Sequence, residues 1–157
     1  MQLSFGMIFS IILIIFFVAF AFYAIGKILP AGDEFKISLF INDLKGVVDD
    51  MWRGTQGEQL FSTDLPKKVE GVCFVDFNKR PNSNEEIYRD FELYSDTGWN
   101  TFFFPVGSSE AVKGFSLNNL NVTATTISQN PLCIQNDKKI EFFIKKDFGD
   151  VQPRITR

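Results

Sequence analysis

The two cysteines, Cys73 and Cys133, are the residues of this sequence that could form one defined covalent bond. Each lies within a short apolar stretch that is typical of a β-strand, VCFVD for the first and PLCIQ for the second. Closing a loop of about 60 residues would stabilise a fold by roughly 4 kcal/mol in the chain-entropy model. We therefore predict a Cys73–Cys133 disulfide, which implies an oxidising compartment. The alternative is two separate buried thiols.

The remaining residues show no pattern that is specific for catalysis or for a metal. The chain has no histidine, which excludes Ser-His and Cys-His nucleophiles and histidine metal ligands. Two cysteines without a CxxC motif do not form a structural zinc site. The acidic pairs Asp49-Asp50 and Glu85-Glu86 are typical of a solvated surface, although a fold could bring two carboxylates together for glycoside chemistry. We expect no catalytic residue, no metal, no cofactor and no enzymatic activity.

Two further features bear on modification and on partners. Asn121 begins an Asn-Val-Thr tripeptide that fits the N-glycosylation pattern, although the tripeptide often occurs by chance and here overlaps a predicted strand. The chain carries 16 Lys and Arg against 19 Asp and Glu, a net charge of -3. A mildly acidic chain argues against binding to nucleic acid, which needs a basic face.

An uncharged segment, Leu3–Gly26, dominates the N-terminal part of the sequence and is followed by Lys27. A helix of this length rises 1.5 Å per residue and would span roughly 36 Å, whereas the hydrocarbon core of a bilayer is about 30 Å thick. We predict a hydrophobic transmembrane or filament-core helix over residues 1–29. A cleaved secretory signal is the competing interpretation, but no Lys or Arg precedes the apolar core, which is longer than such signals have.

The side of the membrane on which the rest of the chain lies can be argued in both directions. Lys27 and Lys36 flank the apolar segment on its C-terminal side, which weakly places the following domain in the cytoplasm. The cysteine pair and the candidate glycosylation site point outward instead. We expect membrane lipid as one partner, with the C-terminal domain outside the cell, either on a membrane anchor or in an extracellular filament.

Residues 30–57 are predicted to contain a kink and an amphipathic helix. Pro30 and Gly32 are expected to break or kink the first helix, because proline removes a hydrogen-bond donor and glycine costs helix stability. A second helix runs from Asp33 or Glu34 to about Trp52, and the Gly-Thr-Gln-Gly stretch ends it. We expect its apolar face to pack on a sheet. Its apolar residues recur at intervals of three and four: Ile37, Phe40, Ile41, Leu44, Val47, Val48 and Met51.

In residues 58–157 the sequence pattern differs: short segments rich in Phe, Val and Ile are separated by turn residues. This pattern predicts an antiparallel β-sheet or a small β-sandwich, and with the helices it gives an α+β fold. The C-terminal stretch Val151–Arg157 adds an edge strand or stays loose. The predicted strands are Gln59–Ser62, Val69–Phe77, Ile87–Tyr94, Trp99–Val106, Phe115–Val122, Leu132–Gln135 and Lys139–Lys145.

Alternation along these strands predicts which side chains share a face. Phe102 and Phe104 lie on one side of their strand and Phe103 lies on the other. A strand that is apolar on both faces is usually central and buried. The alternative for this aromatic run is a contact with another subunit. The predicted faces elsewhere are Val69, Cys73, Val75 and Phe77 in one strand and Ile140, Phe142 and Ile144 in another.

The order of elements, a hydrophobic helix, an amphipathic helix and a disulfide-bearing β domain, resembles the type IV pilin architecture, especially archaeal pilin-like proteins. The stretch QLSFG at residues 2–6, followed by an Ile/Phe-rich run, carries the resemblance. VCFVD together with NPLCI is also similar to small membrane-anchored proteins of archaeal genomes. The resemblance implies helices that bundle in a filament core and a β surface that makes lateral contacts. The assembly contacts would then be Gly6, Ser10, Phe16, Phe17, Phe20 and Phe103.

Two functions from different classes fit these features. A structural, pilin-like subunit would assemble through its N-terminal helix, with further copies or other envelope proteins as partners. A single-pass, membrane-anchored module outside the cytoplasm would bind a partner or serve as an accessory subunit of a membrane complex. An anchored enzyme is a third hypothesis, and it would need a carboxylate cleft with raised pKa values.

Overall fold

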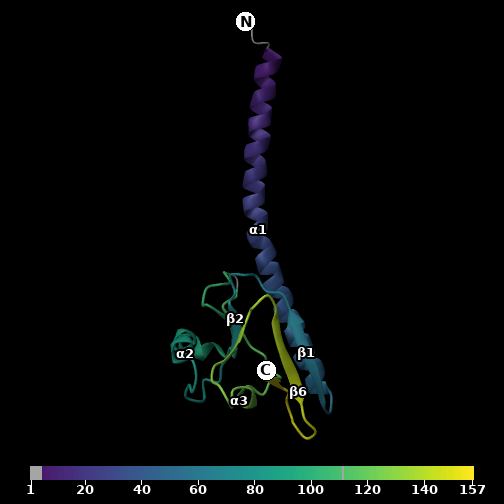
Figure 1. Ribbon diagram of the computed structural model, residues 1–157, viewed down its shortest axis with the longest axis vertical. Coiled ribbons are helices and arrows are strands. Elements are labelled where there is room, and N and C mark those ends of the chain that lie inside the picture. The colour runs from purple at the N-terminus through teal and green to yellow at the C-terminus, as the bar shows by residue number, and fades with distance from the viewer. Residues whose placement is uncertain (1–4, 111) are drawn as a thin grey trace. The chain divides into compact units, whose positions relative to one another are not determined.

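The computed structural model describes residues 5–110 and 112–157 (Figure 1). The chain divides into two compact units, Met1–Phe35 and Lys36–Arg157. Helices together with antiparallel sheets confirm the predicted α+β class. The elements in chain order are α1 (Phe5–Arg53), β1 (Gly57–Thr63), β2 (Gly71–Phe74), α2 (Glu85–Glu92), the 3-10 helix η1 (Ser95–Thr97), β3 (Thr101–Phe104), β4 (Gly114–Phe115), α3 (Val122–Thr125), β5 (Leu132–Gln135), β6 (Ile140–Lys146) and β7 (Arg154–Thr156).

Helix α1 is assigned without interruption from Phe5 to Arg53, so the break predicted after Pro30 is not present. A proline inside a helix removes one backbone hydrogen bond, and long helical segments on both sides can sustain the helix through that loss. The kink alternative stays a prediction. The C-terminal end of the helix is where it was expected, just before Gly54, whose N–H donates to the carbonyl oxygen of Asp50 at 3.2 Å.

Strands β1, β6 and β7 form one antiparallel sheet, sheet A, in the order β1-β6-β7. Its register places Phe61 of β1 opposite Phe142 of β6, and Ile155 of β7 opposite Ile144 of β6. Alternation along β6 confirms the predicted face, because Ile140, Phe142 and Ile144 are all buried. Strand β7 confirms the edge-strand alternative for the C-terminal stretch.

Strands β2 to β5 form sheet B, in the order β4-β3-β2-β5. In the middle of this sheet, Cys73 of β2 lies opposite Phe102 of β3 on one side and Cys133 of β5 on the other. Phe74 and Phe103 belong to the cluster of buried residues on one face, whereas Cys73 and Phe102 belong to the cluster on the other. Sheet B therefore buries both of its faces, as predicted for a strand that is apolar on both sides.

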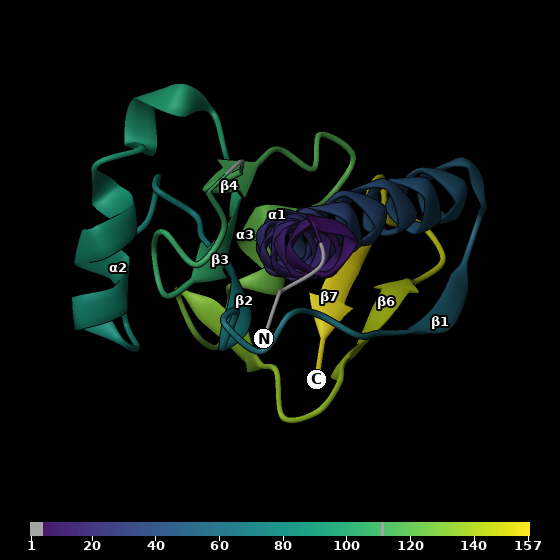
Figure 2. The same cartoon turned by 90° about the horizontal axis from the view of Figure 1, so that it is seen from above.

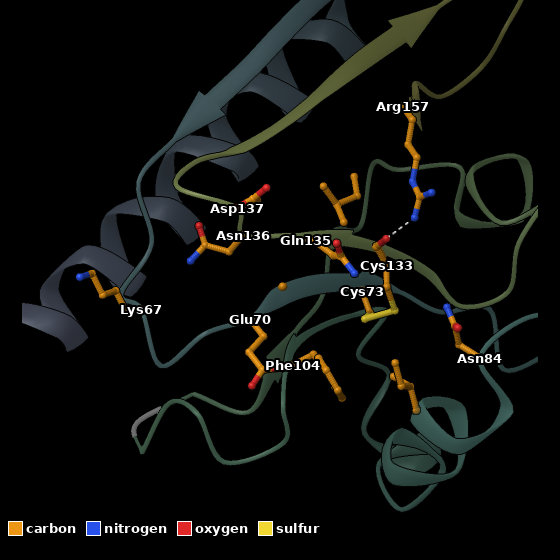
Figure 3. Close-up of a pocket in the computed structure, with 13 residues that line it drawn as sticks. Lys67, Glu70, Cys73, Asn84, Phe104, Cys133, Gln135, Asn136, Asp137 and Arg157 are labelled. Carbon is orange, nitrogen blue, oxygen red and sulfur yellow. Dashed lines mark hydrogen bonds between the residues drawn. A yellow bond between two sulfur atoms is a disulfide. The ribbon is translucent and has the colours of Figure 1, made fainter.

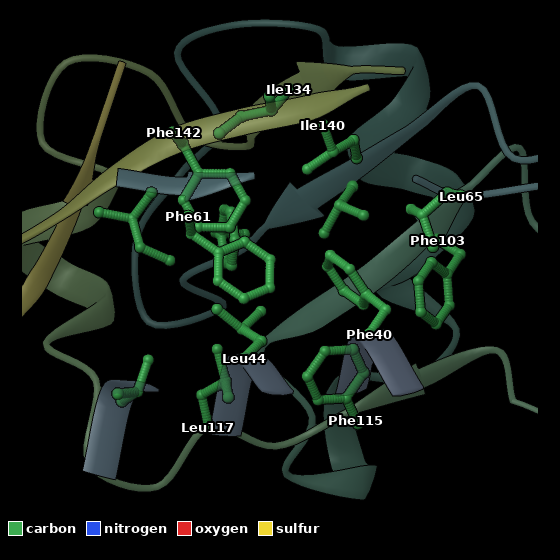
Figure 4. Packing of buried hydrophobic residues seen from close by; sticks show 14 of the residues in the cluster. Phe40, Leu44, Phe61, Leu65, Phe103, Phe115, Leu117, Ile134, Ile140 and Phe142 are labelled. Atoms are coloured by element: carbon green, nitrogen blue, oxygen red, sulfur yellow. The ribbon is translucent and has the colours of Figure 1, made fainter. Parts of the chain in front are cut away.

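The larger core lies between the C-terminal part of α1 and the inner faces of the two sheets (Figure 4). The ring of Phe40 is central, with its centroid 5.7 Å from those of Phe61 and Phe103 and 6.4 Å from that of Phe115. The predicted apolar face of this helical segment and its packing on the sheets are confirmed. The buried residues of the face are Ile37, Phe40, Leu44 and Val48, and Ile41, Val47 and Met51 are partly buried beside them.

A smaller core lies between sheet B and α2, which Figures 1 and 2 place beside β2 and β3 and away from β1. Phe91 of α2 stacks on Phe102 with ring centroids 4.6 Å apart. The strand predicted over Ile87–Tyr94 is therefore wrong, since residues 85–92 are helical. Ile87, Phe91 and Tyr94 are separated by four and three residues, so they fit one face of a helix better than one face of a strand.

Other strand predictions extend too far, including Trp99–Val106, of which only Thr101–Phe104 forms a strand. The predicted strand Phe115–Val122 contains only the last residue of β4, and the chain then leads to α3, whose N-cap residue is Asn121. Val69 was predicted to share a face with Cys73, but it precedes β2 and is buried in the larger core. In the last two of these places apolar side chains of irregular segments fill the core, and their spacing resembles strand alternation by coincidence.

Candidate functional site

The most extensive exposed apolar surface of the described chain is the N-terminal part of α1. The 20-residue stretch Gly6–Ile25 is long and apolar enough to cross a membrane, and none of it is buried. Large side chains are exposed throughout this stretch, for example Phe17 at 62% and Phe22 at 73%. At 1.5 Å per residue the stretch measures about 30 Å, which matches the hydrocarbon core of a bilayer. This helix could therefore anchor the chain in a membrane.

Five of the six predicted assembly residues lie on this exposed helix. Gly6, Ser10, Phe17 and Phe20 share one face, because separations of four, seven and three residues return a helix to the same side. Phe16 lies beside that face, and its ring meets the ring of Phe17 edge-on at 6.0 Å. The hydroxyl of Ser10 donates to the carbonyl oxygen of Gly6 at 2.9 Å, so it needs no partner outside the helix.

Phe103, the sixth predicted assembly residue, does not belong to an exposed surface. Its side chain is 1% exposed, and its ring lies 5.7 Å from that of Phe40 and 5.8 Å from that of Phe115. Protein cores are close-packed, so Phe103 could reach another subunit only if this core opened. The prediction that Phe103 makes an assembly contact is therefore wrong, and the core-packing alternative for the aromatic run holds.

The predicted disulfide is present between Cys73 of β2 and Cys133 of β5, with the two Cα atoms 4.0 Å apart. The two residues are directly opposite each other in the antiparallel register, which brings both side chains to the same face of sheet B. The bond joins the central strand β2 to the edge strand β5 across a sequence separation of 60. No cysteine in the described part of the chain is free.

A groove of about 400 Å³ lies on the same face of sheet B, beside the disulfide (Figure 3). Gly71 forms part of its floor, and the register places this glycine opposite Phe104 on one side and Gln135 on the other. A Cβ atom on Gly71 would lie 2.6 Å from the carbonyl oxygen of Ile134, so no larger residue fits. The absent side chain leaves a hollow between the half-buried Phe104 and the exposed Gln135.

Charged side chains from three separate segments surround this groove, which is referred to below as the disulfide groove. Lys67 and Glu70 come from the segment before β2, Asp137 follows β5, and Arg157 follows β7. A guanidinium nitrogen of Arg157 donates to the carbonyl oxygen of Cys133 (Figure 3). Among the residues that the structure describes, no ion pair engages Lys67, Glu70 or Asp137.

Asn136 joins two of the segments that form the wall of the disulfide groove. Its side-chain nitrogen donates to the carbonyl oxygens of Val69 at 2.8 Å, Pro66 at 3.3 Å and Leu65 at 3.5 Å. Its side-chain oxygen is buried and has no hydrogen-bond partner in the described part of the chain. Buried acceptors without a donor are rare in native structures. The three hydrogen bonds donated by the same amide hold Asn136 in this position.

Lys146 is a buried cation that ties sheet A to the end of α1. Its side chain donates to the carbonyl oxygen of Trp52 at 2.7 Å and to that of Gly54 at 2.8 Å. These carbonyls lie at the C-terminal end of the helix, where free carbonyl oxygens and the helix dipole both favour a positive charge. The contact fixes the last turn of α1 to the end of β6.

An exposed network of charges lies around the turn between β6 and β7. Arg154 donates to Asp147 and, at 2.9 Å, to Asp150, and the Lys145 ammonium lies 3.4 Å from Asp147. The hydrogen bond from Arg154 is the main reason that the pKa of Asp147 falls below its usual value of 3.8. The same hydrogen bond raises the pKa of Arg154. Exposed networks of this kind contribute little to stability.

Both polar residues of the glycosylation tripeptide are engaged in local structure. The side-chain oxygen of Asn121 accepts from the N–H of Ala124 at 2.9 Å and so caps α3. The hydroxyl of Thr123 donates to the carboxylate of Asp76 at 2.7 Å. These contacts explain the two polar side chains without a glycan, and glycosylation of Asn121 stays a prediction.

The acidic pairs of the sequence take part in surface interactions. Asp49 accepts from the side chain of Asn119 at 2.7 Å, and Asp50 lies 3.9 Å from Arg53. Glu85 lies 4.0 Å from Arg89 on α2. Within residues 5–110 and 112–157, no group of three or more His, Cys, Asp or Glu side chains is placed to hold a metal ion.

The sequence did not predict the disulfide groove or the contact of Lys146 with α1. An isolated glycine inside a strand often marks a close approach of another backbone, and Gly71 was therefore a usable signal. The period of two that places Ile140, Phe142 and Ile144 on one face also places Lys146, and not Lys145, on that face, so this alternation was a usable signal.

Comparisons with known proteins gave no match, whether with protein-family models, with curated proteins or with solved structures. A functional interpretation therefore depends on the fold and on the two surfaces described above, the apolar helix and the disulfide groove.

Proposed function

We propose that this chain is a structural cell-surface protein, a pilin-like subunit whose N-terminal helix assembles into a filament core while the β domain stays outside. One observation carries the proposal: α1 consists of two apolar parts with different partners. Residues Ile37–Met51 are packed into the core of the β domain, whereas Gly6–Ile25 exposes large apolar side chains that no described part of the chain covers.

The exposed part of α1 needs an apolar environment from outside the chain. A helix that is hydrophobic on all sides belongs either in a protein interior or in a membrane. In a filament, copies of the same helix would replace lipid, and association would depend on close van der Waals packing. The face with Gly6 and Ser10 would allow two backbones to approach closely, and Phe17 and Phe20 on the same face would fill the space further along.

The disulfide supports the placement of the β domain outside the cytoplasm. Disulfides persist in oxidising compartments and are rare where cellular thiols keep proteins reduced. Lys27 and Lys36, on the C-terminal side of the apolar stretch, argue in the opposite direction. A direct test is to trap free thiols in cells before lysis. Fully paired Cys73 and Cys133 are expected, whereas two trapped thiols would contradict the outside placement.

A single-pass anchored module is the second candidate function, and the length of the apolar stretch favours it. Gly6–Ile25 spans about 30 Å as a helix, which is the thickness of a bilayer's hydrocarbon core. In this alternative, lipid covers the helix permanently, and the β domain binds a partner or an envelope component as a monomer.

Immunogold electron microscopy with an antibody against the β domain separates the two candidates. Intact cells and sheared surface material are both labelled. Gold along regular filaments in the sheared fraction is the expected result for a filament subunit. Gold confined to the cell membrane would contradict the filament proposal and favour the anchored module. Labelling only after permeabilisation would contradict the outside placement in both.

A further inference from the structure

We propose that the disulfide groove is a binding site for a neutral saccharide. The proposal does not depend on whether the protein forms filaments or stays as an anchored module, because the groove lies entirely within the unit Lys36–Arg157. Three properties of the groove carry it: a preformed hollow with an apolar wall, polar side chains without partners, and balanced charge.

The hollow is set by the register of sheet B. Gly71 lies between Phe104 and Gln135 in one cross-strand row, and it must be glycine because of the backbone of Ile134. The hollow therefore exists without a ligand and costs no rearrangement when a ligand enters. Its volume of about 400 Å³ lies within the range of about 300–1,000 Å³ that is usual for small-molecule sites.

The walls of the groove match the two kinds of surface on a sugar ring, its apolar C–H face and its polar hydroxyl groups. Phe104 and Ile87 line the groove with apolar surface, against which the C–H face of a ring can pack. Figure 3 shows Phe104 and Gln135 on either side of the floor, near the disulfide. A ring placed there would have hydrocarbon on one side and an amide on the other.

The polar side chains around the groove have hydrogen-bonding capacity that the fold does not use. In the described part of the chain, the side chains of Glu70, Asn84, Gln135 and Asp137 accept and donate no hydrogen bond. Planar carboxylates and amides such as these suit neighbouring sugar hydroxyls, because each can accept or donate at two positions.

The charges around the groove favour a neutral ligand. Two cations, Lys67 and Arg157, are matched by two anions, Glu70 and Asp137. An anionic ligand such as a phosphate would be attracted by the two basic groups and repelled by the two carboxylates, and the reverse holds for a cation, so the groove's balanced charge favours neither sign. Saccharides without charged substituents avoid both costs and still use every donor and acceptor.

A second cavity, lined by residues that include Gln129, Leu132 and Arg154, serves as an internal comparison. It is similar in size, about 450 Å³, but its lining has no aromatic ring and no carboxylate among the described residues. Its charged groups are Arg154, which is engaged by Asp147 and Asp150, and Arg157, which it shares with the disulfide groove. A cavity of similar volume that offers a sugar neither an aromatic wall nor a carboxylate is predicted not to bind a saccharide.

The test uses the full chain in detergent micelles with two probes, N,N′-diacetylchitobiose and maltose, followed by saturation-transfer NMR and by titration calorimetry. We expect at least one probe to bind with a Kd of about 1 mM or tighter. Gln135→Ala, at an exposed position, is expected to weaken binding about tenfold or more, and Phe104→Ala is expected to do the same. The matched controls are Gln129→Ala in the second cavity and Phe148→Ala at an exposed aromatic residue outside the groove.

Three outcomes would overturn the proposal. One is that neither probe binds to the folded, disulfide-bonded protein. Another is that the control substitutions weaken binding as much as the groove substitutions do. The third is that both probes fail while an extended peptide protects Gln135 and Phe104, which would assign the groove to a protein partner. Circular dichroism of each variant keeps loss of binding separate from loss of folding.

Discussion

The two apolar parts of α1 have the same helical backbone and opposite surroundings. Phe40 is 1% exposed and touches three other aromatic rings, whereas Phe17, on the same helix, is 62% exposed. The segment with Phe40 alternates apolar with charged residues, but the segment with Phe17 carries no charge on any side. A helix with one apolar stripe can bury that stripe against its own chain. A helix that is apolar on all sides needs lipid or other chains to bury its surface.

The largest expected effect comes from removing one aromatic ring from the packed part of α1 and comparing this with the removal of one ring from the exposed part. Phe40→Ala should lower the free energy of unfolding of the β domain by about 3–5 kcal/mol, because it leaves a cavity among packed rings. Phe17→Ala, the matched control, should leave that free energy unchanged. Urea unfolding of the full chain in micelles measures both. Equal losses would show that the N-terminal part of α1 is also packed on the β domain.

The disulfide gives the next largest effect, and it acts only on the β domain. Replacing Cys73 and Cys133 together by alanine should cost roughly 2–4 kcal/mol, since the unfolded chain is no longer constrained by the closed loop. The measurement is chemical unfolding with and without reductant. Reduced wild-type protein should match the double variant, and no loss of stability on reduction would contradict the assigned pairing.

Lys146 tests how firmly the packed part of α1 is held at its end. Lys146→Met should lower the free energy of unfolding by roughly 1–3 kcal/mol, because the carbonyl oxygens of Trp52 and Gly54 lose their buried donor. Lys145→Met removes an exposed cation from the neighbouring position and should cost less than about 1 kcal/mol. Thermal unfolding of the two variants compares them, and a larger effect at position 145 would contradict the register of β6.

The smallest effect concerns the exposed network at the turn between β6 and β7. Because Arg154 lowers the pKa of Asp147 in the folded protein, this carboxylate contributes stability above its unfolded value of 3.8. The contribution is lost as the pH falls from 3.8 through the lower folded pKa. Asp147→Asn should therefore reduce the acid sensitivity of the β domain below pH 3.8, and unfolding midpoints measured across that range would detect it. An unchanged acid profile would show that Arg154 does not hold the carboxylate.

Periodic segments of the sequence were sufficient to predict much of the fold. The apolar helix, the face of Ile37–Met51 and the strands near β1, β5 and β6 each have a regular pattern that continues long enough to be decisive. Helix α2 was missed because Ile87, Phe91 and Leu93 mimic a period of two over eight residues. The structure shows Leu93 to be 84% exposed, so only the helical spacing of Ile87 and Phe91 was informative.

Of the two candidate sites, one could be recognised from the sequence and the other could not. The exposed helix could be recognised from residue types alone, because its chemistry is the same at every position. The disulfide groove could not, because it depends on which residues of β3 and β5 lie opposite Gly71. Phe103 was misassigned to a subunit contact for a related reason. Its burial depends on Phe40 of α1, which covers one face of sheet B, and on Phe115 of the neighbouring strand β4, and these contacts are a property of the tertiary fold.

Cysteine cross-linking in intact cells tests the central claim, that copies of this chain cover the N-terminal part of α1. Phe17→Cys introduces a thiol on the exposed helix of a chain whose two natural cysteines are paired. Ser128→Cys, at an exposed position of the β domain, is the control. With a membrane-permeant oxidant, we predict covalent dimers for Phe17→Cys that are retained in sheared surface filaments, and few for Ser128→Cys. Monomers only, for Phe17→Cys in both the membrane and the sheared fraction, would contradict the claim and leave lipid as the partner of this helix.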